Sequence, residues 1–125
     1  LVILVLAMLH NRTFQPYYDI MPTSLTHFPV FWDNTDNAYR TRCDAMGSDF
    51  HAMVEQRRNQ IDSEYKTLCN IYASFATMCS PLHYKGLRTL VGSRNFGVTI
   101  RSQRASALVP FADMLNHSTN RDWID

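Results

Sequence analysis

The sequence predicts an α+β fold in which helices come first and a small sheet follows. From about Asp49 to Tyr72, apolar residues recur at steps of three, four and seven, as in an α-helix with one buried face. A second helix is expected from Ser80-Pro81, and two short apolar runs after Gly92 resemble strands. Because helical and strand segments lie in separate runs and do not alternate, the pattern favours α+β over α/β.

The first third of the chain is apolar and then aromatic. Residues 1–10 predict a buried helix, and residues 14–32 combine prolines with many aromatic side chains. Prolines at this density exclude a continuous helix, and aromatic side chains at this density favour burial. We therefore expect an ordered, packed loop over residues 14–32. The polar residues from Asp33 to Asp36 supply N-cap candidates for the next helix.

The helix expected at residues 49–72 would be about 35 Å long at a rise of about 1.5 Å per residue, so it should lie across another layer. Its apolar stripe consists of Phe50, Met53, Val54, Ile61, Tyr65, Leu68 and Tyr72. The following helix has Ser80 as its cap and Pro81 in its first position, and it should end near Gly92-Ser93. Its apolar face consists of Tyr84, Leu87, Leu90 and Val91.

Two strands are predicted near the end of the chain, at Phe96–Ile100 and Ala107–Pro110. The polar stretch from Arg101 to Ser106 should join them as a hairpin-like turn. A short apolar segment from Phe111 to Ser118 follows and is closed by polar residues.

Composition and charge exclude several classes of protein. Hydrophobic residues make up 46% of the 125 residues and charged residues 18%, which is too apolar for a disordered chain. The net charge is +1, and the densest basic spot, Arg57-Arg58, precedes Asp62 and Glu64. This pattern is typical of a solvated helix face with i,i+4 pairs, so no nucleic-acid partner is expected.

Cysteine usage and the chain ends bear on the compartment. Cys43, Cys69 and Cys79 lack C-x-x-C spacing, which argues against a disulfide framework and a structural zinc site and favours small buried residues in a reducing compartment. The run Leu1–Leu9 is far shorter than the about 20 residues of a membrane span. An intracellular protein, cytoplasmic or nuclear, without a membrane partner is expected, and both ends look cut from a longer chain.

Common catalytic signatures are missing from the sequence. It contains no H-E-x-x-H, G-x-S-x-G, Walker or G-x-G-x-x-G pattern, and its five histidines are scattered. Taken alone, Arg94 would be a surface arginine after a helix, and Asp113 a cap for a turn. Asn116 by itself could fill a left-handed turn position.

The stretch from Arg88 to Ser118 is the most informative part of the chain. It contains Ser93-Arg94-Asn95-Phe96, and it ends in Leu108-Val109-Pro110-Phe111-Ala112-Asp113-Met114-Leu115-Asn116-His117-Ser118. This arrangement resembles SET-domain protein methyltransferases, specifically the group of Rubisco large-subunit methyltransferase and actin-histidine methyltransferase. The loop from Pro16 to Pro22 and the long helix resemble that family more loosely, so the resemblance covers nearly the whole chain.

The resemblance implies a partial SET domain over residues 1–125. A helical insertion with flanking helices would occupy about residues 1–92. The C-terminal SET portion, up to the Asn-His motif, would occupy about residues 93–125.

The resemblance also implies S-adenosyl-L-methionine as the cofactor, without a metal. Arg94, Asn116 and His117 would bind it, and Arg94 and Asp113 would contact the substrate. Arginine can hold a carboxylate with two parallel hydrogen bonds, and an asparagine amide both donates and accepts. A carboxylate such as that of Asp113 could orient a cationic amine.

Other parts of the family's active site are not in this sequence. The Gly-x-Gly cofactor loop is absent, and the pore tyrosine is expected beyond Asp125, so we assign no catalytic residue. None of the tyrosines present is carried over to that role; they are Tyr17, Tyr18, Tyr39, Tyr65, Tyr72 and Tyr84.

The parent is expected to be a protein-lysine (or histidine) N-methyltransferase, with lysine favoured, and the 125-residue piece alone to be inactive. The alternatives are a catalytically inactive SET-like protein-binding module and, behind it, an unrelated helical scaffold. Substrate protein and oligomeric state stay open.

Overall fold

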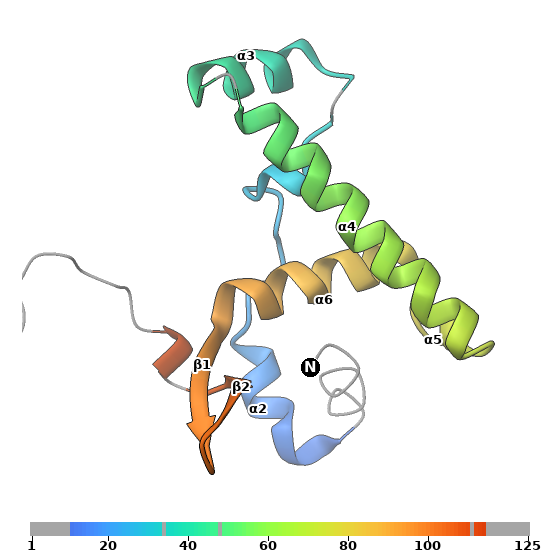
Figure 1. Cartoon of the computed structure of the whole chain (residues 1–125), viewed down its shortest axis with the longest axis vertical. Helices are drawn as coiled ribbons and strands as arrows, with labels where there is room; N and C mark the ends of the chain where they lie inside the picture. Colours follow the sequence, from blue (N-terminus) through green and yellow to red (C-terminus); the bar gives the residue numbers. More distant parts are fainter. Residues whose placement is uncertain (1–10, 34, 48, 111, 115–125) are drawn as a thin grey trace, which may run out of the picture. The chain divides into compact units, whose positions relative to one another are not determined.

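A computed structural model describes residues 11–33, 35–47, 49–110 and 112–114. These residues form helices and one two-stranded antiparallel sheet, with the sheet late in the chain (Figure 1). The predicted mixture of helices and a small sheet is therefore confirmed. The helix expected over residues 1–10 lies outside the described residues. The chain divides into two compact units, one from Leu1–Ile20 with Thr89–Asp125 and one from Met21–Arg88.

The aromatic segment contains short helical turns but no continuous helix, as predicted. The turns are η1 (Arg12–Phe14), α2 (Gln15–Asp19) and η2 (Pro29–Phe31). Pro16 lies in the first turn of α2, where a missing N–H breaks no helical hydrogen bond. The expected packing is confirmed, because every aromatic of the segment is half-buried; these are Phe14, Tyr17, Tyr18, Phe28, Phe31 and Trp32.

Helix α3 (Asn37–Ala45) was not predicted, and its N-cap, Asp36, is one of the four cap candidates that the sequence offered for the next expected helix. The Asp36 carboxylate accepts from the Ala38 N–H at 3.0 Å. The helix escaped prediction because it is mostly polar, with only Tyr39 and Cys43 buried, one turn apart. These two side chains form a core cluster with Val54, against which Trp32 and Phe50 pack.

Helix α4 (Phe50–Ile71) confirms the long predicted helix, but its apolar stripe is only partly buried. Val54 and Ile61 are buried, whereas Met53 and Tyr72 are exposed. Met53 lies about 100° around the helix from Val54, away from the centre of the buried face. Tyr72 is the C-cap, and its extended backbone takes it off the helical stripe.

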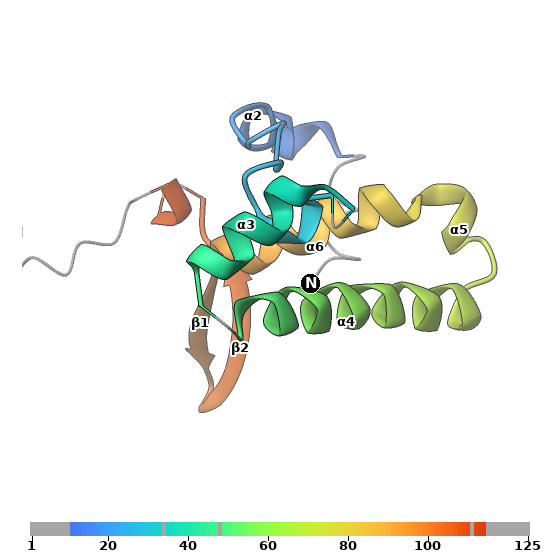
Figure 2. The same cartoon turned by 90° about the horizontal axis from the view of Figure 1, so that it is seen from above.

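Helix α5 (Phe75–Met78) follows, and Figure 2 shows the chain turning back there from α4 into α6 (Pro81–Arg94). The predicted start of α6 is confirmed, because the Ser80 hydroxyl accepts from the His83 N–H at 3.2 Å. Its predicted apolar face is also buried, namely Tyr84, Leu87, Leu90 and Val91. The helix continues past Gly92-Ser93 and ends at Arg94.

The sheet pairs β1 (Asn95–Ile100) with β2 (Gln103–Leu108) (Figure 1). The predicted hairpin is confirmed, but its turn is shorter than the expected Arg101–Ser106, since only Arg101 and Ser102 form it. Both have positive φ, 49° and 64°, as two-residue hairpin turns require. Residues 103–106 escaped prediction because they are exposed, and an exposed stretch carries no apolar alternation.

Two further expectations concern cysteines and membranes. Cys43 and Cys79 are buried free thiols and Cys69 is a half-buried one, as predicted for small packing residues. Among the described residues, no helix is long and apolar enough to cross a membrane.

Candidate functional site

The hairpin register determines where the candidate site forms. Asn95, the first residue of β1, pairs with Leu108, the last residue of β2. Arg94 precedes Asn95, and the segment carrying Asp113 follows Leu108, so both lie at the same end of the hairpin. The two-residue turn therefore brings together two residues that lie 19 positions apart in the sequence.

Asp113 lies in a short 3-10 turn, η3 (Ala112–Met114), after Pro110. Proline has no N–H for a sheet ladder, so strand pairing ends near Pro110 and the chain turns. The Asp113 N–H donates to the Val109 carbonyl at 3.1 Å and fixes this turn. The Asp113 side chain is 0% exposed, which is an unusual position for a carboxylate.

Arg94 pairs with this buried carboxylate. Its Nη1 donates to Asp113 Oδ2 and to the Asp113 carbonyl oxygen, both at 3.3 Å. The Arg94 side chain is itself only 15% exposed. The two residues that the family resemblance suggests for the substrate side of one site are therefore in contact with each other.

Tyr17, which sequence reasoning set aside, is the third member of this cluster. Its hydroxyl donates to Asp113 Oδ2 at 2.5 Å, across 96 positions of sequence. Burial, followed by the hydrogen bond to Asp113 and the charge of Asp113, raises the pKa of Tyr17 far above its usual value. The phenol therefore stays protonated and donates. Its place in the Pro-Tyr-Tyr-Asp segment was the one sequence signal that could have suggested it. We name Arg94, Asp113 and Tyr17 the Arg94 cluster.

The hydrogen bonds of the Asp113 carboxylate are unevenly distributed. Oδ2 accepts from both Tyr17 and Arg94, whereas the buried Oδ1 has no hydrogen-bond partner among the described residues. Thr89 Oγ1 is also buried without one there, but a hydroxyl is less costly to desolvate than a carboxylate oxygen. Oδ1 can accept a hydrogen bond, and no described residue supplies the donor.

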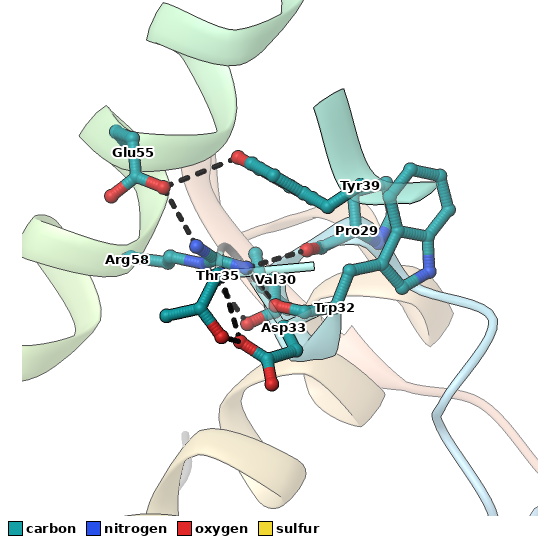
Figure 3. A network of polar contacts seen from close by, with 8 residues as sticks. All are labelled: Pro29, Val30, Trp32, Asp33, Thr35, Tyr39, Glu55 and Arg58. Atoms are coloured by element: carbon teal, nitrogen blue, oxygen red, sulfur yellow. Dashed lines mark hydrogen bonds and ion pairs between the residues drawn. The ribbon is translucent and has the colours of Figure 1, made fainter. Parts of the chain in front are cut away.

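Two more clusters combine an arginine, a carboxylate and a tyrosine, both in the unit Met21–Arg88. In the Arg58 cluster (Arg58, Glu55 and Tyr39), Arg58 and the Tyr39 hydroxyl both donate to Glu55 Oε1, at 2.7 and 3.2 Å (Figure 3). In the Arg88 cluster (Arg88, Glu64 and Tyr84), Arg88 Nε and the Tyr84 hydroxyl donate to Glu64 Oε2, at 2.8 and 3.3 Å.

Arg58 also holds the aromatic segment against α4. Its guanidinium donates to the backbone carbonyls of Pro29, Val30 and Trp32 (Figure 3). The interpretation of Arg57-Arg58 as a solvated face with i,i+4 pairs is wrong for Arg58, whose side chain is only 11% exposed. Periodicity could not reveal this role, because the acceptors are backbone carbonyls from another segment.

The other predicted site residues, Asn116 and His117, lie outside the described residues. Within the described ranges, no group of three His, Cys, Asp or Glu side chains could hold a metal ion.

Comparisons with protein-family models, with curated proteins and with solved structures found no match to this chain.

Proposed function

We propose that this chain is part of a SET-type protein methyltransferase that transfers a methyl group from S-adenosyl-L-methionine to a protein side chain, with lysine as the favoured acceptor and histidine as the second choice. The observation that supports this best is the Arg94–Asp113 contact, 3.3 Å long, directly before the Asn116-His117 motif. Two charged residues that the family resemblance assigns to one site are adjacent in space, which is expected if the segment folds as it does in that family.

The groups present suit the proposed cofactor. Its amino-acid part carries a carboxylate and an ammonium group. Arg94 uses Nη1 for Asp113, and its Nε and Nη2 have no hydrogen bond among the described residues, so they can donate to a carboxylate. Asn116 would add an amide donor and acceptor, and the backbone at His117 a further N–H and C=O.

When bound, S-adenosyl-L-methionine supplies an activated methyl group. The residues of this chain contribute binding and orientation: Arg94, Asn116 and His117 hold the cofactor, and Asp113 orients the acceptor amine. Such positioning lowers the barrier by fixing the reacting atoms in line before the reaction.

The test uses the longest open reading frame that contains these 125 residues. The purified protein is incubated with methyl-labelled S-adenosyl-L-methionine and candidate acceptor proteins, and cofactor binding is measured by calorimetry. Asn116→Ala is compared with Asn59→Ala, a substitution at an exposed position of α4. We expect Asn116→Ala to abolish labelling and weaken binding, and Asn59→Ala to change neither.

Two results would contradict the enzyme proposal in different ways. A folded protein that does not bind the cofactor but captures a partner protein would be the SET-like binding module. If the protein binds the cofactor and Asn116→Ala leaves the affinity unchanged, the Asn-His segment is accidental.

A further inference from the structure

The Arg94 cluster differs from the other two clusters in the exposure of its carboxylate. The side chains of Glu55 and Glu64 are 32% and 31% exposed, so water can complete their hydrogen bonding. The side chain of Asp113 is 0% exposed, and its Oδ1 is unpartnered among the described residues. A buried carboxylate oxygen without a hydrogen-bond donor is unfavourable. A hydrogen bond to it should therefore contribute more binding free energy at this cluster than at the other two.

The orientation of Asp113 Oδ1 depends on the groups that hold Asp113 Oδ2. The Tyr17 hydroxyl and Arg94 Nη1 approach the same atom, Oδ2, at 2.5 and 3.3 Å. A carboxylate held at one oxygen by two donors from different segments cannot rotate without breaking both hydrogen bonds. Tyr17 and Arg94 therefore both restrict this rotation.

We propose that Tyr17 is a positioning residue that, together with Arg94, holds Asp113 so that its free oxygen Oδ1 accepts a hydrogen bond from the amine of the methyl acceptor. This proposal rests on the proposed function and adds to it a residue from the aromatic segment near the start of the chain. Tyr17 acts through Asp113 and does not itself touch the reacting atoms.

The matched pair Tyr17→Phe and Tyr18→Phe tests this role. The two tyrosines are neighbours in α2, both are half-buried and their rings are in contact. Each substitution removes one hydroxyl, but among the described residues only that of Tyr17 is hydrogen-bonded to Asp113. Both variants are made in the longest open reading frame, and their folding is checked by circular dichroism.

In the methyl-transfer assay we expect Tyr17→Phe to lower kcat/KM for the protein acceptor roughly 10- to 100-fold, the effect of one hydrogen bond to a charged group. Cofactor affinity should change by less than about twofold, because Tyr17 does not bind the cofactor. In an Asp113→Asn background, Tyr17→Phe should have no further effect, because its action passes through that carboxylate. A purely structural tyrosine would lower thermal stability without this dependence on Asp113.

If Tyr17→Phe is too unstable to assay, Tyr17→Gln and Tyr17→Leu replace it, since only glutamine keeps a donor. The glutamine variant should then be at least about tenfold more active than the leucine variant.

The outcomes separate the two proposals. If the wild-type protein neither binds cofactor nor transfers methyl groups, the proposed function is wrong and the role of Tyr17 fails with it. If the wild type is active and Tyr17→Phe matches Tyr18→Phe in kcat/KM, the methyltransferase proposal stands and the role of Tyr17 is overturned.

Discussion

The two compact units of this chain use the same set of side chains in different ways. In the unit Met21–Arg88, the Arg58 and Arg88 clusters each contain a carboxylate that is about one-third exposed. In the other unit, the Arg94 cluster contains a carboxylate that is fully buried. In all three clusters an arginine and a tyrosine donate to the acid, and the clusters differ most in how far that acid is exposed.

This difference separates a scaffold from a candidate site. Arg58 is also bonded to three backbone carbonyls, and it fastens the aromatic segment to α4 (Figure 3). The Arg94 cluster leaves a buried carboxylate oxygen without a donor among the described residues. Buried polar atoms in folded proteins are nearly always hydrogen-bonded, so this oxygen calls for a donor that the described residues do not supply.

The largest effect is expected from Arg94→Ala. The change would leave Asp113 as a buried charge without its cation, which costs about 3–5 kcal/mol in the free energy of unfolding. Urea unfolding followed by circular dichroism measures the loss. In Arg94→Ala/Asp113→Ala much of the stability should return, because no lone buried charge remains. A loss below about 1 kcal/mol for Arg94→Ala would mean that Asp113 is not the buried ion described here.

A smaller loss in the free energy of unfolding, about 2–4 kcal/mol, is expected for Arg58→Ala, because Glu55 stays partly hydrated when its partner is removed. Arg58→Lys should recover little, since an ammonium group cannot reach three carbonyls as a guanidinium fork does. The control is the neighbouring Arg57→Ala, which removes a contact to the exposed Gln60. Equal losses for the two arginines would contradict the anchoring role of Arg58.

Alkaline pH should lower the free energy of unfolding through the tyrosines of the Arg58 and Arg88 clusters. Burial raises the pKa of Tyr39 and Tyr84 to about 12; Cys43 is the next cause that raises it for Tyr39, and Glu64 is the next for Tyr84. Since folding raises these pKa values above 10.0, the stability gained is complete below pH 10.0 and is lost as the pH rises through about 12. The loss is on the order of 2 kcal/mol per tyrosine.

An ultraviolet titration measures this effect. Tyr39→Phe and Tyr84→Phe should each remove one late-titrating phenol from the curve. If either variant leaves the late part of the titration unchanged, that tyrosine is not buried against its carboxylate.

The smallest effect is expected for Glu64→Gln. Burial raises the pKa of Glu64, but the hydrogen bond and the charge of Arg88 outweigh it, so the pKa lies below its usual value. The stabilisation is therefore present at neutral pH and disappears as the pH falls below about 4. We expect Glu64→Gln to lose about 0.2–1 kcal/mol at pH 7, typical of a partly exposed pair. A difference between the two proteins that persists at pH 3 would point to lost packing and not to lost charge.

Much of the helical part of the fold was predictable from the sequence. Helices α4 and α6 have regular apolar periodicity, and Ser80-Pro81 marks the start of α6. Helix α3 and the first half of β2 were not predicted, because both are mostly polar and exposed. Such segments lack the regular spacing of apolar residues from which a helix or strand is predicted. For the candidate site, local sequence indicated Arg94 and Asp113 but not Tyr17.

The sequence by itself therefore determined the main helices and the hairpin, because these follow from the spacing of apolar and turn residues, whereas Arg94 and Asp113 were suggested only by a family resemblance. Only the tertiary structure decided that Asp113 is buried, that Arg94 and Tyr17 share one of its oxygens, and that Arg58 binds backbone carbonyls. The physical reason is that burial and hydrogen bonding depend on segments far apart in the chain. Tyr17 and Asp113, separated by 96 positions, meet only after the chain has folded.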